Sequence, residues 1–267
     1  MPIMELDDAT IHYEDRGSGP LALLHFHDMG SSGENFETND MDWYAQHFRT
    51  ISFDNRGLGR SGQSKKYSLP LYAADAAHLL EKLGIDKAIV MGVSWGGIVA
   101  QRFALDYPEK TIALVVDSSS PETNLAASEN WYLRAEVARF GSAALPQAEL
   151  KPAFAGHAVI TAEQADATKA RLKPEHLDSY VAQYRAAAGL REHPLTPYLH
   201  KIAVPTLAVG GGKDATAGVG GLIVISRNVP NVRLEIFPEA GHGVSRQDRD
   251  GFRTLLFEFL DANGIAR

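Results

Sequence analysis

The chain has 267 residues, of which 45% are hydrophobic and 22% are charged, and its formal net charge is −7. This length and composition are typical of one globular domain with a sizeable core, and the negative charge argues against binding to a nucleic-acid backbone or an anionic membrane surface. Because the sequence contains no cysteine, disulfides, a thiolate nucleophile and cysteine-bound metals are excluded.

The first 121 residues alternate between predicted strands and predicted helices. Short apolar or alternating runs predict strands at 3–6, 10–14, 21–25, 50–54, 87–91 and 111–117. Helices are predicted at 70–83, closed by Gly84, and after Ser94 as far as Pro108, whereas 35–48 is helical or irregular. We expect the first two strands to be antiparallel and the later ones, joined by helices, to be parallel.

Residues 122–198 interrupt this alternation. They contain no convincing strand and are rich in helix formers, with helices predicted at 125–140, 161–172 and 175–189. We predict a helical cap over the sheet. Its aromatic residues are expected either to pack the cap or to line a pocket, and they are Trp131, Tyr132, Phe140, Phe154, Tyr180 and Tyr184.

The sheet resumes after the cap. Strands at 204–210 and 232–237 flank a helix-like stretch near 218–227, and a final helix is predicted at 246–261. Its apolar face consists of Phe252, Leu255, Leu256, Phe259 and Leu260. We therefore predict an α/β fold in which residues 1–121 and 199–267 form a mostly parallel central sheet with flanking helices, and residues 122–198 form the cap.

Three glycines follow the strand at 50–54 in a pattern that suggests a nucleotide site. Gly57, Gly59 and Gly62 match the G-x-G-x-x-G motif of dinucleotide-binding proteins. That site requires the helix to begin among the glycines, whereas here residues 63–69 precede a helix expected to begin near Pro70. We predict no dinucleotide site, and the sequence implies no metal and no organic cofactor.

A G-x-S-x-G motif, from Gly92 to Gly96 with Ser94 at its centre, lies between a predicted strand and a predicted helix. An abrupt strand-to-helix turn strains its central residue, and glycines two positions away remove side chains that would collide. Such a turn exposes the serine hydroxyl and directs the first N–H groups of the helix at an oxyanion beside it. Ser94 is therefore the candidate nucleophile, and the alternative is a serine that only caps the helix.

A serine nucleophile needs a base, and the base needs an acid that orients it. His242 follows a strand and lies between two glycines, which favours it over the other histidines as the base. Asp214, in the loop after strand 204–210, is the preferred acid. Asp117 is its rival, because it also ends a strand and lies between the serine and the histidine in chain order.

Together these features resemble the α/β-hydrolase fold family over essentially the whole chain. The matching segments are residues 54–61 (DNRGLGRS), 92–96 (GVSWG), 204–214 and 241–243 (GHG), in the family's order. The resemblance implies Ser94 as nucleophile, Asp214 as acid and His242 as base.

The resemblance also implies an oxyanion hole. One donor would be the backbone N–H of Trp95, and the other an N–H from the loop after His25. The family usually has His-Gly in that loop, where this chain has His25-Phe26. Alignment on His25 makes His27 the second donor, and Phe26 is the alternative, either as the donor or as a ring that narrows the pocket.

The same positions restrict the chemistry. Relatives that displace halide or open epoxides carry aspartate at the nucleophile position, and dienelactone hydrolases carry cysteine, so Ser94 argues against all three. Relatives that cleave carbon–carbon bonds often have tryptophan after the catalytic histidine, where this chain has Gly243. We therefore expect a serine hydrolase that cleaves a small or medium carboxylic ester or lactone. The alternatives are carbon–carbon hydrolysis, cofactor-free perhydrolysis or oxygenation on the same triad, and a slow-turnover, receptor-like binding protein.

The N-terminal residues show no basic region followed by an apolar one, and no apolar run reaches membrane-spanning length. We expect a cytosolic monomer or homodimer that acts on a small-molecule ester or lactone, with no nucleic-acid and no membrane partner.

Overall fold

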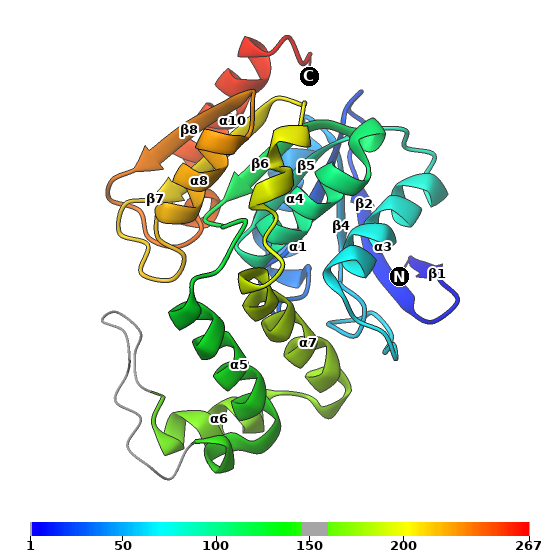
Figure 1. The fold of residues 1–267 in the computed structure, drawn as a ribbon. Helices are drawn as coiled ribbons and strands as arrows, with labels where there is room; N and C mark the ends of the chain where they lie inside the picture. Colours follow the sequence, from blue (N-terminus) through cyan, green and yellow to red (C-terminus); the bar gives the residue numbers. More distant parts are fainter. Residues whose placement is uncertain (1, 146–159, 267) are drawn as a thin grey trace.

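The structure, a computed structural model, describes residues 2–145 and 160–266 and is organised around one eight-stranded sheet (Figure 1). The strands are β1 (Ile3–Glu5), β2 (Thr10–Arg16), β3 (Ala22–Phe26), β4 (Arg49–Phe53), β5 (Ala88–Val93), β6 (Thr111–Asp117), β7 (Thr206–Gly211) and β8 (Val232–Phe237). They lie in the order β1-β2-β4-β3-β5-β6-β7-β8. The pairings β1–β2 and β2–β4 are antiparallel and all the others are parallel.

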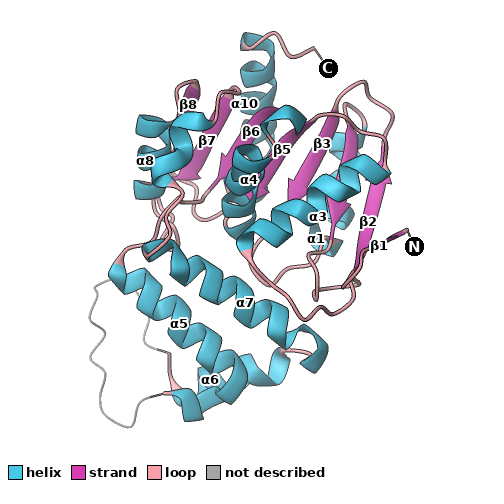
Figure 2. Ribbon diagram, turned by 45° about the vertical axis from the view of Figure 1, so that its right-hand side comes forward, coloured by secondary structure: helices cyan, strands magenta, loops and turns pink. Residues whose placement is uncertain are grey.

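Helices cover both faces of the sheet (Figure 2). One face carries α3 (Leu69–Lys82), α4 (Trp95–Asp106) and α8 (Gly220–Asn228), and the other carries α1 (Glu34–Asn39), α2 (Met41–Ala45), α9 (Val244–Gln247) and α10 (Arg249–Ala262). The predicted α/β fold class is therefore confirmed. Within residues 2–145 and 160–266, no helix combines the length and the apolar character needed to cross a bilayer.

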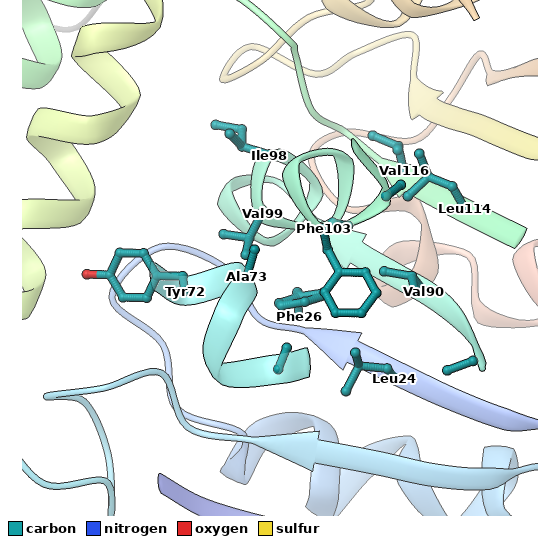
Figure 3. Packing of buried hydrophobic residues seen from close by; sticks show 14 of the residues in the cluster. Leu24, Phe26, Tyr72, Ala73, Val90, Ile98, Val99, Phe103, Leu114 and Val116 are labelled. Carbon is teal, nitrogen blue, oxygen red and sulfur yellow. The ribbon is translucent and has the colours of Figure 1, made fainter. Parts of the chain in front are cut away.

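Two apolar clusters, one on each face of the sheet, form the core. In the cluster beneath α3 and α4, Phe103 points toward the sheet beside Phe26, Leu24 and Val90 (Figure 3). Phe103 is fully buried, and its ring centroid lies 6.0 Å from that of Phe26. Because β3 and β5 are buried on both faces, their sequences do not alternate: β5 is a continuous apolar run, and β3 is apolar except for His25.

Between β6 and β7 the chain leaves the sheet and forms α5 (Leu125–Phe140), α6 (Ala162–Arg171) and α7 (Leu177–Ala188), which lie together at one end of the sheet (Figure 1). These three helices coincide with the predicted segments to within two residues. The remaining short helices are η1 (Pro108–Lys110), η2 (Gly141–Ala144), η3 (Pro174–His176), η4 (Gly189–Arg191) and η5 (Thr196–Lys201). Phe154 lies outside the described residues, and the cap boundaries at residues 122 and 198 stay a prediction.

The C-terminal region differs from the single helix predicted at 246–261. The structure has two helices, α9 and α10, which meet at Asp248. Asp248 has φ −130° and ψ 72°, and its carboxylate accepts a hydrogen bond of 3.0 Å from the N–H of Gly251. It therefore ends one helix and caps the next. The five residues predicted for the apolar face of α10 are nevertheless all buried.

Truncation of Phe103 tests the packing of α4 on the sheet. We expect Phe103→Ala to lower the free energy of unfolding by about 3–5 kcal/mol, because it leaves a cavity in a close-packed cluster. Ile223, which is 37% exposed on α8, provides the control, and Ile223→Ala should change that free energy by about 0.5 kcal/mol or less. Urea unfolding measures both, and losses of equal size would contradict the proposed packing.

Candidate active site

Ser94 occupies a sharp turn between the end of β5 and the start of α4. Its backbone has φ 55° and ψ −118°, and a positive φ is strained for a residue that carries a side chain. The Ser94 N–H donates a hydrogen bond of 2.8 Å to the carbonyl of Asp117, at the end of the neighbouring strand β6. Ser94 is partly exposed and lines the cleft beneath the cap.

Two glycines allow this turn to form. A Cβ at Gly92 would lie 2.1 Å from the carbonyl oxygen of Gly96, and a Cβ at Gly96 would lie 2.2 Å from that of Phe26. Both distances are far below van der Waals contact. The absence of these two side chains therefore lets α4 begin directly against the backbone of residues 26 and 27, as the motif predicts.

The start of α4 presents a backbone donor beside Ser94. The Ser94 carbonyl accepts from the N–H groups of Gly97 (2.9 Å) and Ile98 (3.3 Å). The N–H of Trp95 has no acceptor among the described residues, and it lies at the positive end of the helix dipole. The Trp95 side chain is buried against Tyr72, so this residue offers the cleft its backbone instead of its ring.

His242 and Asp214 meet at the edge of the same cleft. The Nδ1 atom of His242 lies 2.9 Å from Oδ2 of Asp214, and the other carboxylate oxygen accepts from the N–H groups of Thr216 (2.7 Å) and Ala217 (3.0 Å). Burial lowers the pKa of His242, but the hydrogen bond and the charge of Asp214 outweigh burial and hold that pKa above its usual value. Burial raises the pKa of Asp214, and the hydrogen bond from His242 and the two amides reverse this and lower it.

Asp117, the rival acid, has other partners. Its carboxylate is completely buried and accepts hydrogen bonds from the hydroxyl of Ser118 (2.9 Å), from the N–H of Val244 (3.1 Å) and from both the N–H (2.9 Å) and the hydroxyl (2.7 Å) of Ser245. Burial raises the pKa of Asp117 despite these donors. Asp117 therefore anchors the backbone that follows His242, while Asp214 contacts the His242 ring.

The backbone at the end of β3 and in the loop after it lies against the Ser94 turn, at Gly96. The Phe26 ring is buried beside Phe53 and Phe103, so it does not narrow the cleft. The His27 imidazole is also buried, with Nδ1 3.1 Å from Nδ1 of His25 and Nε2 2.9 Å from the hydroxyl of Ser52. Burial lowers the pKa of His27 to about 4, which keeps its ring neutral at neutral pH.

A cleft of about 680 Å³ joins these groups under the cap. Ser94, Trp95 and His242 lie in its wall with Met29 and Ile98, and the cap side supplies Trp131, Arg134 and Tyr184. Of the cap aromatics named from the sequence, Trp131 and Tyr184 line the cleft, whereas Tyr132 and Phe140 are exposed. Tyr180 donates to or accepts from the Tyr184 hydroxyl at 2.9 Å.

The profile of the family described as alpha/beta hydrolase fold matches residues 22–245, which is most of the chain. The chain belongs to this family. The predicted family is therefore confirmed, and the strained serine turn, the His242–Asp214 contact and the cleft are features of one fold.

Proteins similar to this α/β hydrolase have hydrolytic names. It is 26% identical over 263 residues to a 2-hydroxy-6-oxononadienedioate/2-hydroxy-6-oxononatrienedioate hydrolase from Pseudomonas sp, covering 95% of this chain and 92% of that protein. It is 28% identical over 277 residues to a poly(3-hydroxyalkanoate) depolymerase from Ectopseudomonas oleovorans, covering 96% and 91%. The crystal structure of MGS-M2, an alpha/beta hydrolase enzyme from a deep-sea metagenome, aligns with a TM-score of 0.80 and 18% identity over 97% of each chain. The family and the two sequence relatives support a hydrolase, and the solved structure shows the shared fold.

Two contacts at the site join residues far apart in the chain and were not predicted from the sequence. Asp28 accepts a hydrogen bond of 2.9 Å from Arg246, 218 residues away in the chain, and the charges of both act on His242. The N–H of Gly30 donates to the side-chain oxygen of Gln183 on α7 (2.8 Å), which fastens the loop after β3 to the cap. Local sequence patterns do not predict contacts between residues so far apart in the chain.

One group among the described residues has metal-ligand spacing, and it comprises His12, Glu37 and Asp54. Arg60 donates to both carboxylates at 2.8 Å, so a guanidinium already balances their charge and the set does not fit a metal ion. The glycines at 57, 59 and 62 lie in a loop, and α3 begins only at Leu69, which is not the geometry of a dinucleotide site.

Alanine at Gly96 tests the close approach of α4 to the loop after β3. The new Cβ would lie 2.2 Å from the carbonyl oxygen of Phe26 and 2.7 Å from that of His27, so we expect Gly96→Ala to lower the free energy of unfolding by about 1–3 kcal/mol. Gly189, with φ −65° and no atom within 4 Å of an added Cβ, is the matched control. Gly189→Ala should be neutral or stabilising by up to about 1 kcal/mol. Thermal unfolding compares the two variants. Equal stabilities would show that the loop after β3 moves away from the new Cβ without loss of unfolding free energy.

Proposed function

We propose that this α/β hydrolase cleaves a small or medium carboxylic ester or lactone through an acyl-enzyme on Ser94. The observation that carries the proposal is the 2.9 Å contact between His242 Nδ1 and Asp214, in the wall of the cleft that Ser94 also lines. A histidine held through Nδ1 presents Nε2 as the free acceptor, which is the arrangement that a serine nucleophile requires.

The proposed reaction begins when the Ser94 hydroxyl attacks the substrate carbonyl and gives its proton to His242. The carbonyl oxygen becomes an oxyanion, which the backbone N–H of Trp95 stabilises together with a second N–H, supplied by His27 in the loop after β3 or by Phe26 at the end of that strand. His242 then protonates the departing alkoxide. A water molecule repeats the sequence on the acyl-enzyme, releasing the acid and regenerating Ser94.

The electrostatics of the site support these roles. Asp214 carries a lowered pKa, so it is ionised at neutral pH and stabilises the imidazolium that forms on His242 during each proton transfer. The chemistry requires no metal or organic cofactor. As part of the same proposal, we assign Asp117 to positioning the loop after His242 and place the protein in the cytosol.

Carbon–carbon bond hydrolysis is the second candidate. A relative 26% identical over nearly the whole chain is a 2-hydroxy-6-oxononadienedioate hydrolase, which favours this reaction. Gly243, where relatives with that activity often carry tryptophan, disfavours it. The depolymerase, at 28% identity, acts on a polyester and favours the ester reaction.

Hydrolysis of p-nitrophenyl acetate and butyrate provides the first test. We expect the wild type to release p-nitrophenol continuously, and Ser94→Ala to lower kcat/KM by about 10³-fold or more, because the nucleophile is lost. Release that is unchanged in the variant would refute the role of Ser94, and one stoichiometric burst that then stalls would indicate a receptor-like protein. A much higher kcat/KM on 2-hydroxy-6-oxononadienedioate than on either ester would favour the carbon–carbon reaction.

The pH dependence tests the base and the acid. His242 must be neutral to accept a proton, and its pKa is raised above 6.5, so kcat/KM should fall as the pH drops through a value above 6.5. Asp214→Asn removes the charge that raises this pKa, which should move the fall to lower pH, and it should also lower kcat by about 10³–10⁴-fold because asparagine fixes the wrong tautomer.

Asp117→Asn is the comparison for that experiment. It should lower the free energy of unfolding by about 1–3 kcal/mol, because the donors from Ser245 lose an acceptor. It should leave the pH of the fall in kcat/KM where it is in the wild type. If the pH at which kcat/KM falls moved in Asp117→Asn but not in Asp214→Asn, Asp117 would be the acid and the proposed role of Asp214 would be refuted.

A further inference from the structure

Arg134 is a cation that lines the cleft beneath the cap without an ionic partner. It lies on α5, and no ion pair joins it to any described residue. Its Nε atom is buried and has no hydrogen-bond acceptor within residues 2–145 and 160–266. A buried donor that forms no hydrogen bond is unfavourable, and the more so when it belongs to a charged group.

Two other arginines of the cap differ from Arg134 in having an ionic partner, although the Nε of Arg139 is also buried without an acceptor. Arg139, also on α5, pairs with Asp178 at 3.1 Å, and Arg185 on α7 pairs with Glu136 at 2.7 Å. Both of these ion pairs are on exposed surface. Arg134 therefore lines the cleft without an ion pair, whereas Arg139 and Arg185, which are outside the cleft lining, are paired with carboxylates.

The surroundings of Arg134 connect it to the reacting groups. Its guanidinium lies 5.9 Å from the ring centroid of Trp131, and the Trp131 ring lies 5.6 Å from that of Tyr184. The charges of both Arg134 and Asp28 act on the Tyr184 hydroxyl, and Asp28 also acts on His242. His242, Asp28, Tyr184 and Arg134 all line the same cleft.

The other charged groups in this cleft leave Arg134 as its available positive site. Asp28 is neutralised by Arg246 at 2.9 Å, and His242 is engaged by Asp214. Glu122, the remaining carboxylate in the lining, is exposed and accepts from the Thr196 hydroxyl. Among the described residues that line the cleft, a ligand would meet one unpaired guanidinium, on the cap side.

We propose that Arg134 binds a carboxylate of the substrate, so that the ester or lactone that this enzyme cleaves is an acidic one. The inference rests on the proposed function and adds the class of substrate. A carboxylate suits the site because its two oxygens match the parallel N–H groups of a guanidinium. Trp131 and Tyr184 would cover the apolar part of such a substrate between Arg134 and Ser94.

Two esters with the same leaving group measure this selectivity. The acidic one is the mono-p-nitrophenyl ester of glutaric acid, and the neutral one is p-nitrophenyl butyrate. We expect the wild type to have the higher kcat/KM on the acidic ester. Arg134→Gln should lower the ratio of kcat/KM for the acidic ester to that for the neutral ester by about 10- to 100-fold, because a charge-assisted pair is lost. Arg134→Lys should restore only part of the ratio, because lysine cannot form the bidentate contact.

Arg139→Gln is the matched control. It removes the same charge from the same helix, at a partly exposed position outside the cleft lining, and should leave the ratio at its wild-type value. An equal loss of ratio in both variants would show a general field effect and overturn the role of Arg134, and an unchanged ratio in Arg134→Gln would overturn it outright. If Ser94-dependent hydrolysis of butyrate persists in that case, the proposed function stands without this inference.

A binding measurement tests the carboxylate site even if the protein hydrolyses neither ester. Glutarate should bind the wild type and Ser94→Ala, detected by calorimetry, and its affinity should fall by about 10-fold or more in Arg134→Gln but not in Arg139→Gln. Equal affinities of the two arginine variants would refute the carboxylate site. Absence of Ser94-dependent hydrolysis together with Arg134-dependent glutarate binding would instead refute the proposed function and keep the anion site.

Discussion

The left-handed backbone at Ser94 is the constraint on which the rest of the site depends. A residue with a side chain holds such a conformation only where its surroundings leave no other choice. Here the preceding strand, the following helix and a hydrogen bond to Asp117 impose it, and Gly92 and Gly96 remove the atoms that would forbid it. The same geometry places Ser94 in the lining of the cleft and leaves the Trp95 N–H without an acceptor in the described structure, so the proposed nucleophile and the proposed oxyanion donor come from one turn.

The end of β6 connects the two sides of this site. The Asp117 carbonyl accepts from the Ser94 N–H, and its carboxylate accepts from Val244 and Ser245. The hydroxyl of Ser118 accepts from the N–H of Gly243 at 2.9 Å. A single strand end therefore fixes the backbone on both sides of the cleft, that of Ser94 and that following His242. A buried carboxylate with four donors is costly to disturb, which suits a group that must hold two loops in register.

The sheet and the cap contribute different kinds of residue to the cleft. Groups at the carboxyl ends of the strands supply the candidate chemistry, while α5 and α7 supply Trp131, Arg134 and Tyr184 to the opposite wall. The contact between Gly30 and Gln183 ties the cap to the loop after β3, so the position of the cap and the position of that loop are linked. Proteins of one fold can therefore act on different substrates, because the residues of the cap can change while those at the strand ends stay the same.

Local patterns of the sequence determined the succession of most strands and helices along the chain and the serine turn, and they singled out a histidine, His242, that lines the same cleft as Ser94. These features depend on residues close together in the chain: apolar runs, glycines at fixed offsets and caps such as Thr161 with Gln164. The division of the C-terminal helix at Asp248 was missed, because an aspartate within a helical pattern can equally face solvent.

Only the tertiary structure decided between Asp214 and Asp117 as the partner of His242. Both end strands of a parallel sheet and both precede the histidine, so chain order cannot separate them. Their surroundings do, because one carboxylate faces the His242 ring and the other the amides that follow it. The unpaired state of Arg134 is likewise a property of the folded chain, since a charge is defined as paired or unpaired by neighbours that the sequence places far away.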